Sequence, residues 1–230
     1  MKLAFILDQL DSIKTYKDSS FAMMREAGIR HHQLFTLQQG DLAWNGAQTV
    51  GFARELELTG QDGAGHRWYR TKEPEEIPLR EFDAVLMRKD PPFNMEYVYT
   101  TYLLELAERQ GALIFNSPQA IRDHNEKLAI AKFPQFTPPT LVTRQESLIR
   151  DFLDEHRDIV LKPLDGMGGA SVFRIHSADY NIGVIMETLT HYGTRTIMAQ
   201  RYIPEITQGD KRILLIAGKP VPYSLARIPK

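Results

Sequence analysis

The sequence contains no cysteine among its 230 residues. This absence excludes disulfides, thiolate metal sites and a cysteine nucleophile. It also fits a reducing compartment, so we expect a cytoplasmic protein. No apolar run approaches the roughly 20 residues that span a bilayer, which predicts no membrane helix. The first residues, MKLAFILDQLD, hold a short apolar run that Asp8 and Asp11 interrupt, and this favours a buried strand over a signal peptide.

The chain also lacks an excess of either charge, with 28 basic and 29 acidic side chains and a net charge of −1. A balanced charge gives no general attraction to nucleic acid or to an anionic membrane, although a local basic site can still hold phosphates. Apolar residues make up 43% and charged residues 25%, which is typical of a globular protein. We therefore expect neither a nucleic-acid partner nor a membrane partner.

Strands and helices alternate over about the first 120 residues. Asp18 is placed to cap one helix and Pro118 to begin another. A third helix, predicted at 95–110, has an expected inward face of Val98, Tyr102, Leu103, Leu106 and Ala107. This alternation predicts a doubly wound α/β domain with a parallel sheet. Strands are predicted at 3–7, 32–37, 82–93 and 112–116, helices at 19–31, 95–110 and 117–133, and an Asn-Gly hairpin at 44–47.

A different order of elements follows three prolines at positions 134, 138 and 139. Two of the predicted strands here flank a glycine-rich loop, and two more surround a turn at Gly218–Lys219. The remaining predictions are strands at 140–143 and 196–204 and helices at 144–157 and 181–193.

The segment VLKPLDGMGGASVFRI, residues 160–175, places three glycines between two apolar runs. A P-loop carries its lysine after the glycines and opens a helix, whereas Lys162 comes four residues before Gly166. A dinucleotide-binding loop needs a third glycine where Ser171 stands. The residues after the loop predict a strand, so the loop joins two strands and has no helix dipole behind it.

A glycine-rich loop between strands is still able to bind phosphate, because its backbone N–H groups can cover phosphate oxygens. Lys162 would then add a charge-assisted contact from the preceding strand. A flexible hairpin turn with a surface lysine explains the same residues equally well. The chemistry of the loop alone leaves both interpretations open.

Three further stretches accompany this loop: MRKDPPF at 87–93, DHNEKLAIAKF at 123–133 and MAQRYIPEITQGDKRILLIAGKPVPYSLARIP at 198–229. Together they resemble the bacterial glutathione synthetases, a family of ATP-grasp carboxylate–amine ligases, and the resemblance extends over nearly the whole chain. It implies an α/β architecture in which ATP-grasp α+β subdomains follow a parallel-sheet domain. The implied parts are the N-terminal domain at 1–122, a central subdomain with the glycine-rich lid at 123–203, and an incomplete C-terminal subdomain at 204–230.

The resemblance also implies a reaction. ATP phosphorylates the carboxylate of the cysteine residue in γ-glutamylcysteine, and the amine of glycine then displaces phosphate to give glutathione. Arg212 and Arg227 are implied to face the transferring phosphoryl group and the peptide, since a guanidinium suits bidentate contact with phosphate or carboxylate. The implied ATP contacts are Lys127, Lys162, Gly166, Gly168, Gly169, Gln200, Tyr202, Ile203 and Asp210.

Ordinary explanations exist for several of these residues when the family is set aside. Lys127 fits a solvated helix lysine, Asp210 a turn residue after Gly209, and the segment 199–204 a core strand. Arg212 and Arg227 fit surface positions of an edge strand.

The peptide substrate is assigned two further residues. Arg88 follows a predicted strand, where open α/β sheets bind ligands, and we assign it together with Ser20 to γ-glutamylcysteine. The alternatives are a salt bridge from Arg88 to Asp90 and a helix cap formed by Ser20.

The chain stops at Lys230, whereas the resemblance implies a further acidic, asparagine-bearing stretch that holds Mg²⁺. We therefore expect no metal ligand within these residues, and an incomplete enzyme that is poorly active alone. The implied full protein is a homo-oligomer that uses ATP and Mg²⁺. Two alternatives stay open: a nucleotide-binding module without catalysis, and a different ATP-grasp peptide ligase.

Overall fold

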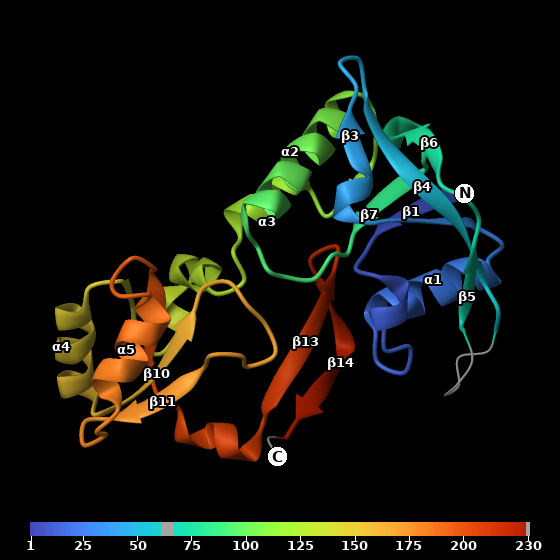
Figure 1. Cartoon of the computed structure of the whole chain (residues 1–230). Coiled ribbons are helices and arrows are strands. Elements are labelled where there is room, and N and C mark those ends of the chain that lie inside the picture. The colour runs from blue at the N-terminus through green and yellow to red at the C-terminus, as the bar shows by residue number, and fades with distance from the viewer. Residues whose placement is uncertain (61–66, 229–230) are drawn as a thin grey trace. The chain divides into compact units, whose positions relative to one another are not determined.

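The computed structural model describes residues 1–60 and 67–228. The chain divides into two compact units (Figure 1). Unit 1 comprises Met1–Ala129 and Asp165–Gly168, and unit 2 comprises Ile130–Leu164 and Gly169–Lys230. Within the described ranges, no helix has the length and apolar character needed to cross a membrane.

Unit 1 is built on an eight-stranded sheet with the order β3-β4-β2-β1-β7-β8, in which β5 and β6 also pair with β4. The neighbours β2, β1, β7 and β8 run parallel, and the strands around β4 are antiparallel. The strands are β1 (Lys2–Ile6), β2 (Gln33–Leu37), β3 (Leu42–Trp44), β4 (Thr49–Leu58), β5 (Tyr69–Thr71), β6 (Glu75–Pro78), β7 (Ala84–Met87) and β8 (Ile114–Phe115).

Helices cover both faces of this sheet, as the alternation in the sequence predicts. Residues 4 and 6 pack in one core with α2 (Met95–Arg109), and residues 5 and 7 pack in another with α1 (Ser19–Ile29). Both sides of β1 therefore pack against apolar cores, which is why residues 3–7 are all apolar. The Asp18 carboxylate accepts a hydrogen bond from the Phe21 N–H at 2.8 Å and begins α1, which confirms the predicted cap.

The inward face of α2 differs from the prediction. Its buried residues are at positions 97, 100, 101, 104 and 107, whereas Tyr102 is 49% exposed. Thr100 and Thr101 are tolerated on the buried face because their hydroxyls donate to the backbone carbonyls of Glu96 and Val98. Because two of the buried residues are threonines, the apolar pattern of the sequence did not show which side of the helix is buried.

The helix predicted at 117–133 is interrupted. It forms α3 (Pro118–Asp123), followed by the 3-10 helix η4 (Leu128–Lys132). Between them the Asn125 side-chain oxygen accepts hydrogen bonds from the N–H groups of Lys127 and Leu128, at 3.0 and 2.9 Å. This local pairing competes with a continuous helix and starts a new turn.

Unit 2 contains a four-stranded antiparallel sheet with the order β11-β10-β12-β9. The helices α4 (Glu146–His156) and α5 (Ile182–Thr190) cover one face of it. That face presents residues 159 and 161 of β10 and residues 197 and 199 of β12, all nearly fully buried. The strands are β9 (Thr140–Thr143), β10 (Asp158–Pro163), β11 (Phe173–His176) and β12 (Ile197–Arg201).

A separate two-stranded sheet completes unit 2. It consists of β13 (Asp210–Ile216) and β14 (Lys219–Arg227), which confirms the two strands predicted around Gly218. Gly209 immediately before it has φ +102°, and a side chain at this position would collide with the backbone carbonyl of Arg227. The close approach of the two strands therefore requires glycine here.

Candidate functional site

The glycine-rich loop joins the antiparallel strands β10 and β11, so the predicted strand–loop–strand order is confirmed. Gly166, Gly168 and Gly169 have φ values of +146°, +71° and +81°. Apart from chain neighbours, no described atom would lie within 4 Å of a side chain at these positions. The backbone conformation, and not crowding, is what favours glycine in this loop.

Lys127 contacts the same loop from within unit 1. Its ammonium donates to the carbonyl oxygen of Gly166 and lies 3.3 Å from the Glu126 carboxylate. Only 17% of the Lys127 side chain is exposed. A well-solvated helix lysine, the ordinary explanation, does not describe this environment. The contact joins two of the residues that the resemblance assigns to ATP.

Lys162 lies on the face of the unit 2 sheet opposite the α4 and α5 helices, since its neighbours Leu161 and Pro163 alternate with it along β10. Its Nζ donates to Gln200 Oε1 at 2.5 Å. Gln200 lies on β12 and is 9% exposed, and its Nε2 donates to Thr140 Oγ1 on β9 at 2.9 Å. A line of polar side chains therefore crosses three adjacent strands.

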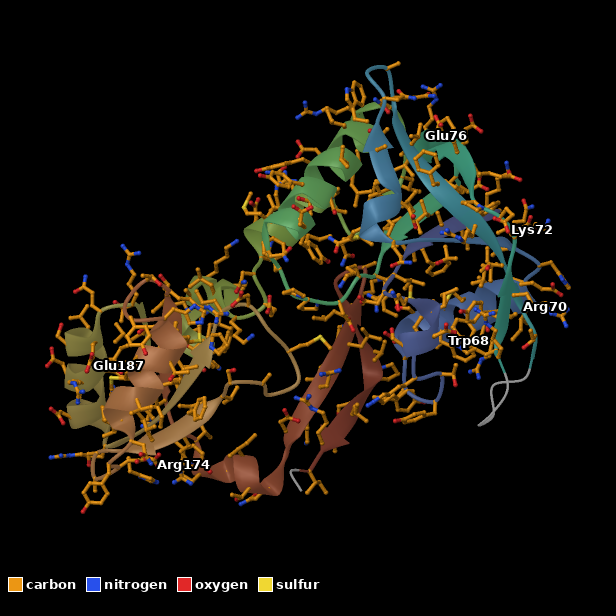
Figure 2. All side chains as sticks on the ribbon, viewed as in Figure 1. Trp68, Arg70, Lys72, Glu76, Arg174 and Glu187 are labelled. Atoms are coloured by element: carbon orange, nitrogen blue, oxygen red, sulfur yellow. The ribbon has the colours of Figure 1, made fainter. Side chains whose placement is uncertain are left out.

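The chain that follows β12 is held by an arginine which the sequence analysis missed. The Arg174 guanidinium lies 3.6 Å from the centroid of the Tyr202 ring (Arg174 is labelled in Figure 2). It also donates to both carboxylate oxygens of Asp158, at 3.0 and 2.6 Å, and so lowers the pKa of Asp158. The Tyr202 N–H donates to the Asp158 carbonyl at 3.0 Å, whereas Ile203 is 46% exposed.

Three predicted residues lie on the β13–β14 hairpin. The Arg227 guanidinium donates to both carboxylate oxygens of Asp210, and these hydrogen bonds lower the pKa of Asp210. Arg212 is exposed on β13, opposite Leu225. Two residues assigned to different substrates, Asp210 and Arg227, thus contact each other directly.

The two residues assigned to the peptide substrate also meet. Arg88 follows β7 in unit 1 and donates to the hydroxyls of Ser19 and Ser20, at 2.9 and 3.1 Å. Ser20 is buried within α1 and the cap is Asp18, so the helix-cap explanation of Ser20 is wrong. Burial raises the pKa of Asp90, two residues after Arg88, and the negative charges of Asp8 and Asp18 raise it further.

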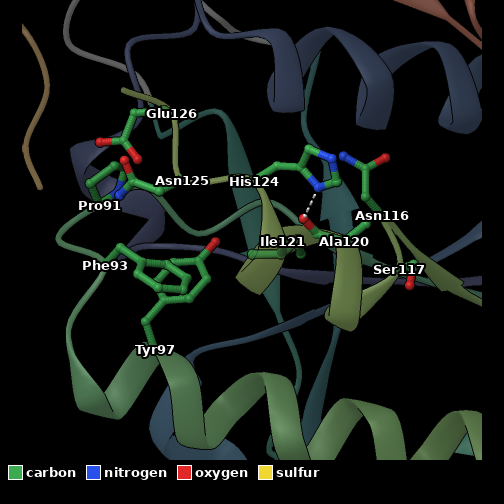
Figure 3. A pocket seen from close by; sticks show the side chains of 10 residues that line it. All are labelled: Pro91, Phe93, Tyr97, Asn116, Ser117, Ala120, Ile121, His124, Asn125 and Glu126. Atoms are coloured by element: carbon green, nitrogen blue, oxygen red, sulfur yellow. Dashed lines mark hydrogen bonds between the residues drawn. The ribbon is translucent and has the colours of Figure 1, made fainter. Parts of the chain in front are cut away.

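A pocket of about 550 Å³ opens beyond β7 and β8 in unit 1 (Figure 3). Phe93 and Tyr97 form one wall, with ring centroids 5.1 Å apart. The His124 ring nitrogen Nδ1 lies 2.9 Å from the Ala120 carbonyl oxygen, and Glu126 brings a carboxylate to the rim. This pocket was not predicted, because the sequence analysis placed residues 117–133 in one continuous helix.

The fold occurs in solved structures of low sequence identity. A D-cycloserine synthetase matches with a TM-score of 0.63 and 14% identity, over 100% of this chain and 76% of that chain. The RimK domain protein ATP-grasp from Sphaerobacter thermophilus matches with a TM-score of 0.57 and 18% identity, over 93% of this chain and 69% of that chain. These matches show that the chain shares the fold of those structures, of which the second is named as an ATP-grasp protein.

Sequence comparison identifies the family within that class. The model for the N-terminal domain of prokaryotic glutathione synthetase matches residues 1–122, and the model for its ATP-grasp domain matches residues 126–230. The glutathione synthetase of Nitrosomonas europaea is 72% identical over 230 residues, and that of Ralstonia nicotianae is 58% identical over 229. All of this chain is covered, and 72% and 70% of those two proteins. The chain belongs to the prokaryotic glutathione synthetase family.

Proposed function

We propose that the chain serves the ATP-dependent ligation of glycine to γ-glutamylcysteine. The carboxylate of the cysteine residue takes the γ-phosphoryl group of ATP, and ADP leaves. The glycine amine then attacks the acyl carbon, the C–N bond forms, phosphate departs and the amine loses a proton. The observation that carries this proposal is the match of two consecutive glutathione synthetase models to residues 1–122 and 126–230.

We assign nucleotide binding to the residues that the resemblance implies. Lys127 and Lys162 supply positive charge to the triphosphate, and each charge-assisted contact contributes about 1.5–3 kcal/mol. Backbone N–H groups of the loop glycines cover the phosphates. The contacts to the base and ribose are assigned to Gln200, Tyr202, Ile203 and Asp210.

The acceptor side is assigned to arginines. Arg88, which Ser19 and Ser20 hold in place, is proposed to bind a carboxylate of γ-glutamylcysteine. Arg212 and Arg227 are proposed to stabilise charge on the transferring phosphoryl group. Because Asp210 engages the Arg227 guanidinium, substrate must share or replace that carboxylate.

Magnesium is proposed to enter with ATP, where it neutralises phosphate charge. Among residues 1–60 and 67–228 there is no group of three or more His, Cys, Asp or Glu side chains arranged to hold a metal ion. No magnesium ligand is therefore assigned to these residues. The working enzyme is proposed to be a cytoplasmic homo-oligomer, which light scattering on purified protein tests.

The reaction is tested by measuring phosphate release with ATP, Mg²⁺, γ-glutamylcysteine and glycine. Release that requires both acceptors supports the proposal, and release with a different acid–amine pair points to another peptide ligase. ATP binding without release identifies a nucleotide-binding module. The variant Arg88→Met should raise the KM for γ-glutamylcysteine by at least about tenfold and leave ATP affinity unchanged.

A further inference from the structure

The side chains of Lys162, Gln200 and Thr140 form a line of hydrogen bonds across unit 2, called the polar line below. Donation along this line has one possible direction. At one end the Lys162 ammonium can only donate, and at the other end the Pro138 carbonyl can only accept. Thr140 Oγ1 donates to that carbonyl at 2.8 Å and accepts from Gln200 Nε2 at 2.9 Å. The Gln200 carbonyl oxygen therefore has to face Lys162, which it does at 2.5 Å. Both ends of the line dictate the orientation of the Gln200 amide.

The strand register brings these groups together. Gln200 pairs with Thr140 across β12 and β9, and Lys162 pairs with Met198, two residues before Gln200 on β12. Side chains two residues apart on a strand share a face, so Lys162, Gln200 and Thr140 lie on the face opposite α4 and α5. Gln200 is 9% exposed, and a buried amide that loses a partner is costly.

We propose that Thr140 is a positioning residue of the nucleotide site, which acts through Gln200 to aim the Lys162 ammonium. This inference rests on the proposed role of Lys162 in binding ATP. The Gln200 acceptor is a neutral amide, whereas a carboxylate in that place would form an ion pair with the lysine and weaken its attraction for phosphate. Thr140 itself touches no substrate in this account.

The test is calorimetric titration of the whole chain with MgATP, using three variants of β9. Thr140→Val removes the hydroxyl at nearly constant volume and should weaken MgATP binding by roughly three- to tenfold. Thr140→Ser keeps the hydroxyl and should retain affinity. Thr143→Val is the matched control, because Thr143 Oγ1 accepts from the Gln145 N–H at 3.1 Å on the same strand, outside the polar line.

A second measurement needs no nucleotide. The ¹⁵N–¹H signals of the Gln200 side-chain amide should shift in Thr140→Val and keep their positions in Thr140→Ser and Thr143→Val. Equal loss of MgATP affinity in Thr140→Val and Thr143→Val would reduce Thr140 to a structural role and overturn the inference.

The outcomes separate the inference from the proposed function. If Thr140→Val binds MgATP as the unsubstituted chain does while Lys162→Ala binds weakly, the positioning role is wrong and the function stands. If Lys162→Ala also binds normally, Lys162 is not part of the nucleotide site, and the inference is overturned while the ligase function stands. If the unsubstituted chain binds no MgATP, both are overturned.

Discussion

The sheets of the two units differ in how their faces are used. In unit 1, helices pack on both sides of β1, so the polar groups assigned to substrate lie where strands end, as Arg88 does after β7. In unit 2, two helices cover one face, and the other carries Lys162 and Gln200 within the strands. A sheet covered on both sides confines ligand groups to its edge. A sheet with helices on one side can carry ligand groups along its other face.

The comparison predicts opposite effects for two adjacent residues of β10. Leu161 is fully buried against α4 and α5, so Leu161→Ala should lower the free energy of unfolding by about 2–5 kcal/mol. ATP affinity, measured by calorimetry well below the melting temperature, should stay the same. A large loss of ATP affinity in folded Leu161→Ala protein would show that the two faces are not functionally separate.

Lys162→Ala tests the other face. It should weaken ATP binding by about 1.5–3 kcal/mol, because a charge-assisted contact with phosphate is lost, and lower the melting temperature less than Leu161→Ala does, because Gln200 loses a hydrogen-bond partner but no core packing is lost. Lys219→Ala is the control, since Lys219 is an exposed lysine of the same unit at the hairpin turn. Equal ATP affinities in the two variants would remove Lys162 from the nucleotide site.

Gly168 of the glycine-rich loop can be compared with Gly218 of the β13–β14 turn. Gly168 and Gly218 have φ values of +71° and +77°, and both would place a side chain in open space. Alanine at either position should cost about 1–2 kcal/mol of backbone strain. Only Gly168→Ala should also reduce ATP affinity and slow phosphate release, which calorimetry and a phosphate assay measure. Identical behaviour of the two variants would make the loop an ordinary turn.

The smallest effect concerns the edge of the unit 2 sheet. Arg174 lowers the pKa of Asp158, and a carboxylate with a lowered pKa in the folded state stabilises the protein above its unfolded pKa of about 4. That stabilisation disappears as the pH falls through the folded pKa. Arg174→Gln should therefore lower the urea midpoint slightly at pH 7 and hardly at all near pH 2.

Arg174→Lys should behave as an intermediate in the same experiment, because it retains the charge but loses the paired donors to Asp158. A loss in Arg174→Gln that is equally large at pH 2 and pH 7 would exclude the Asp158 carboxylate as its cause. The stacking on Tyr202 would then explain the stabilisation.

The sequence predicts the elements of this fold well where one signal dominates. The apolar run of β1, the Asp18 cap and the strand–loop–strand order around Gly166 all follow from local chemistry. The predictions were wrong where a polar group finds a local partner. Asn125 interrupts a helix that its neighbours favour, and Thr100 and Thr101 occupy a buried helix face.

The contacts of the proposed site residues could not be predicted from the sequence. Lys162, Gln200 and Asp210 were selected through the family resemblance, but which side chains they meet depends on strand register. Thr140 and Arg174 act across adjacent strands from residues up to 60 positions away in the chain. Pairing between distant segments leaves no periodic pattern within either segment, so the sequence alone does not predict it.

The central proposal is that the face of the unit 2 sheet opposite α4 and α5 binds the nucleotide. The most direct measurement is a titration of ¹⁵N-labelled protein with MgATP, followed through backbone and side-chain amide shifts. The largest changes should occur at Gln200 and in the loop at 166–169, with little change in α4 and α5. Changes concentrated on those two helices, with none at Gln200, would contradict this proposal.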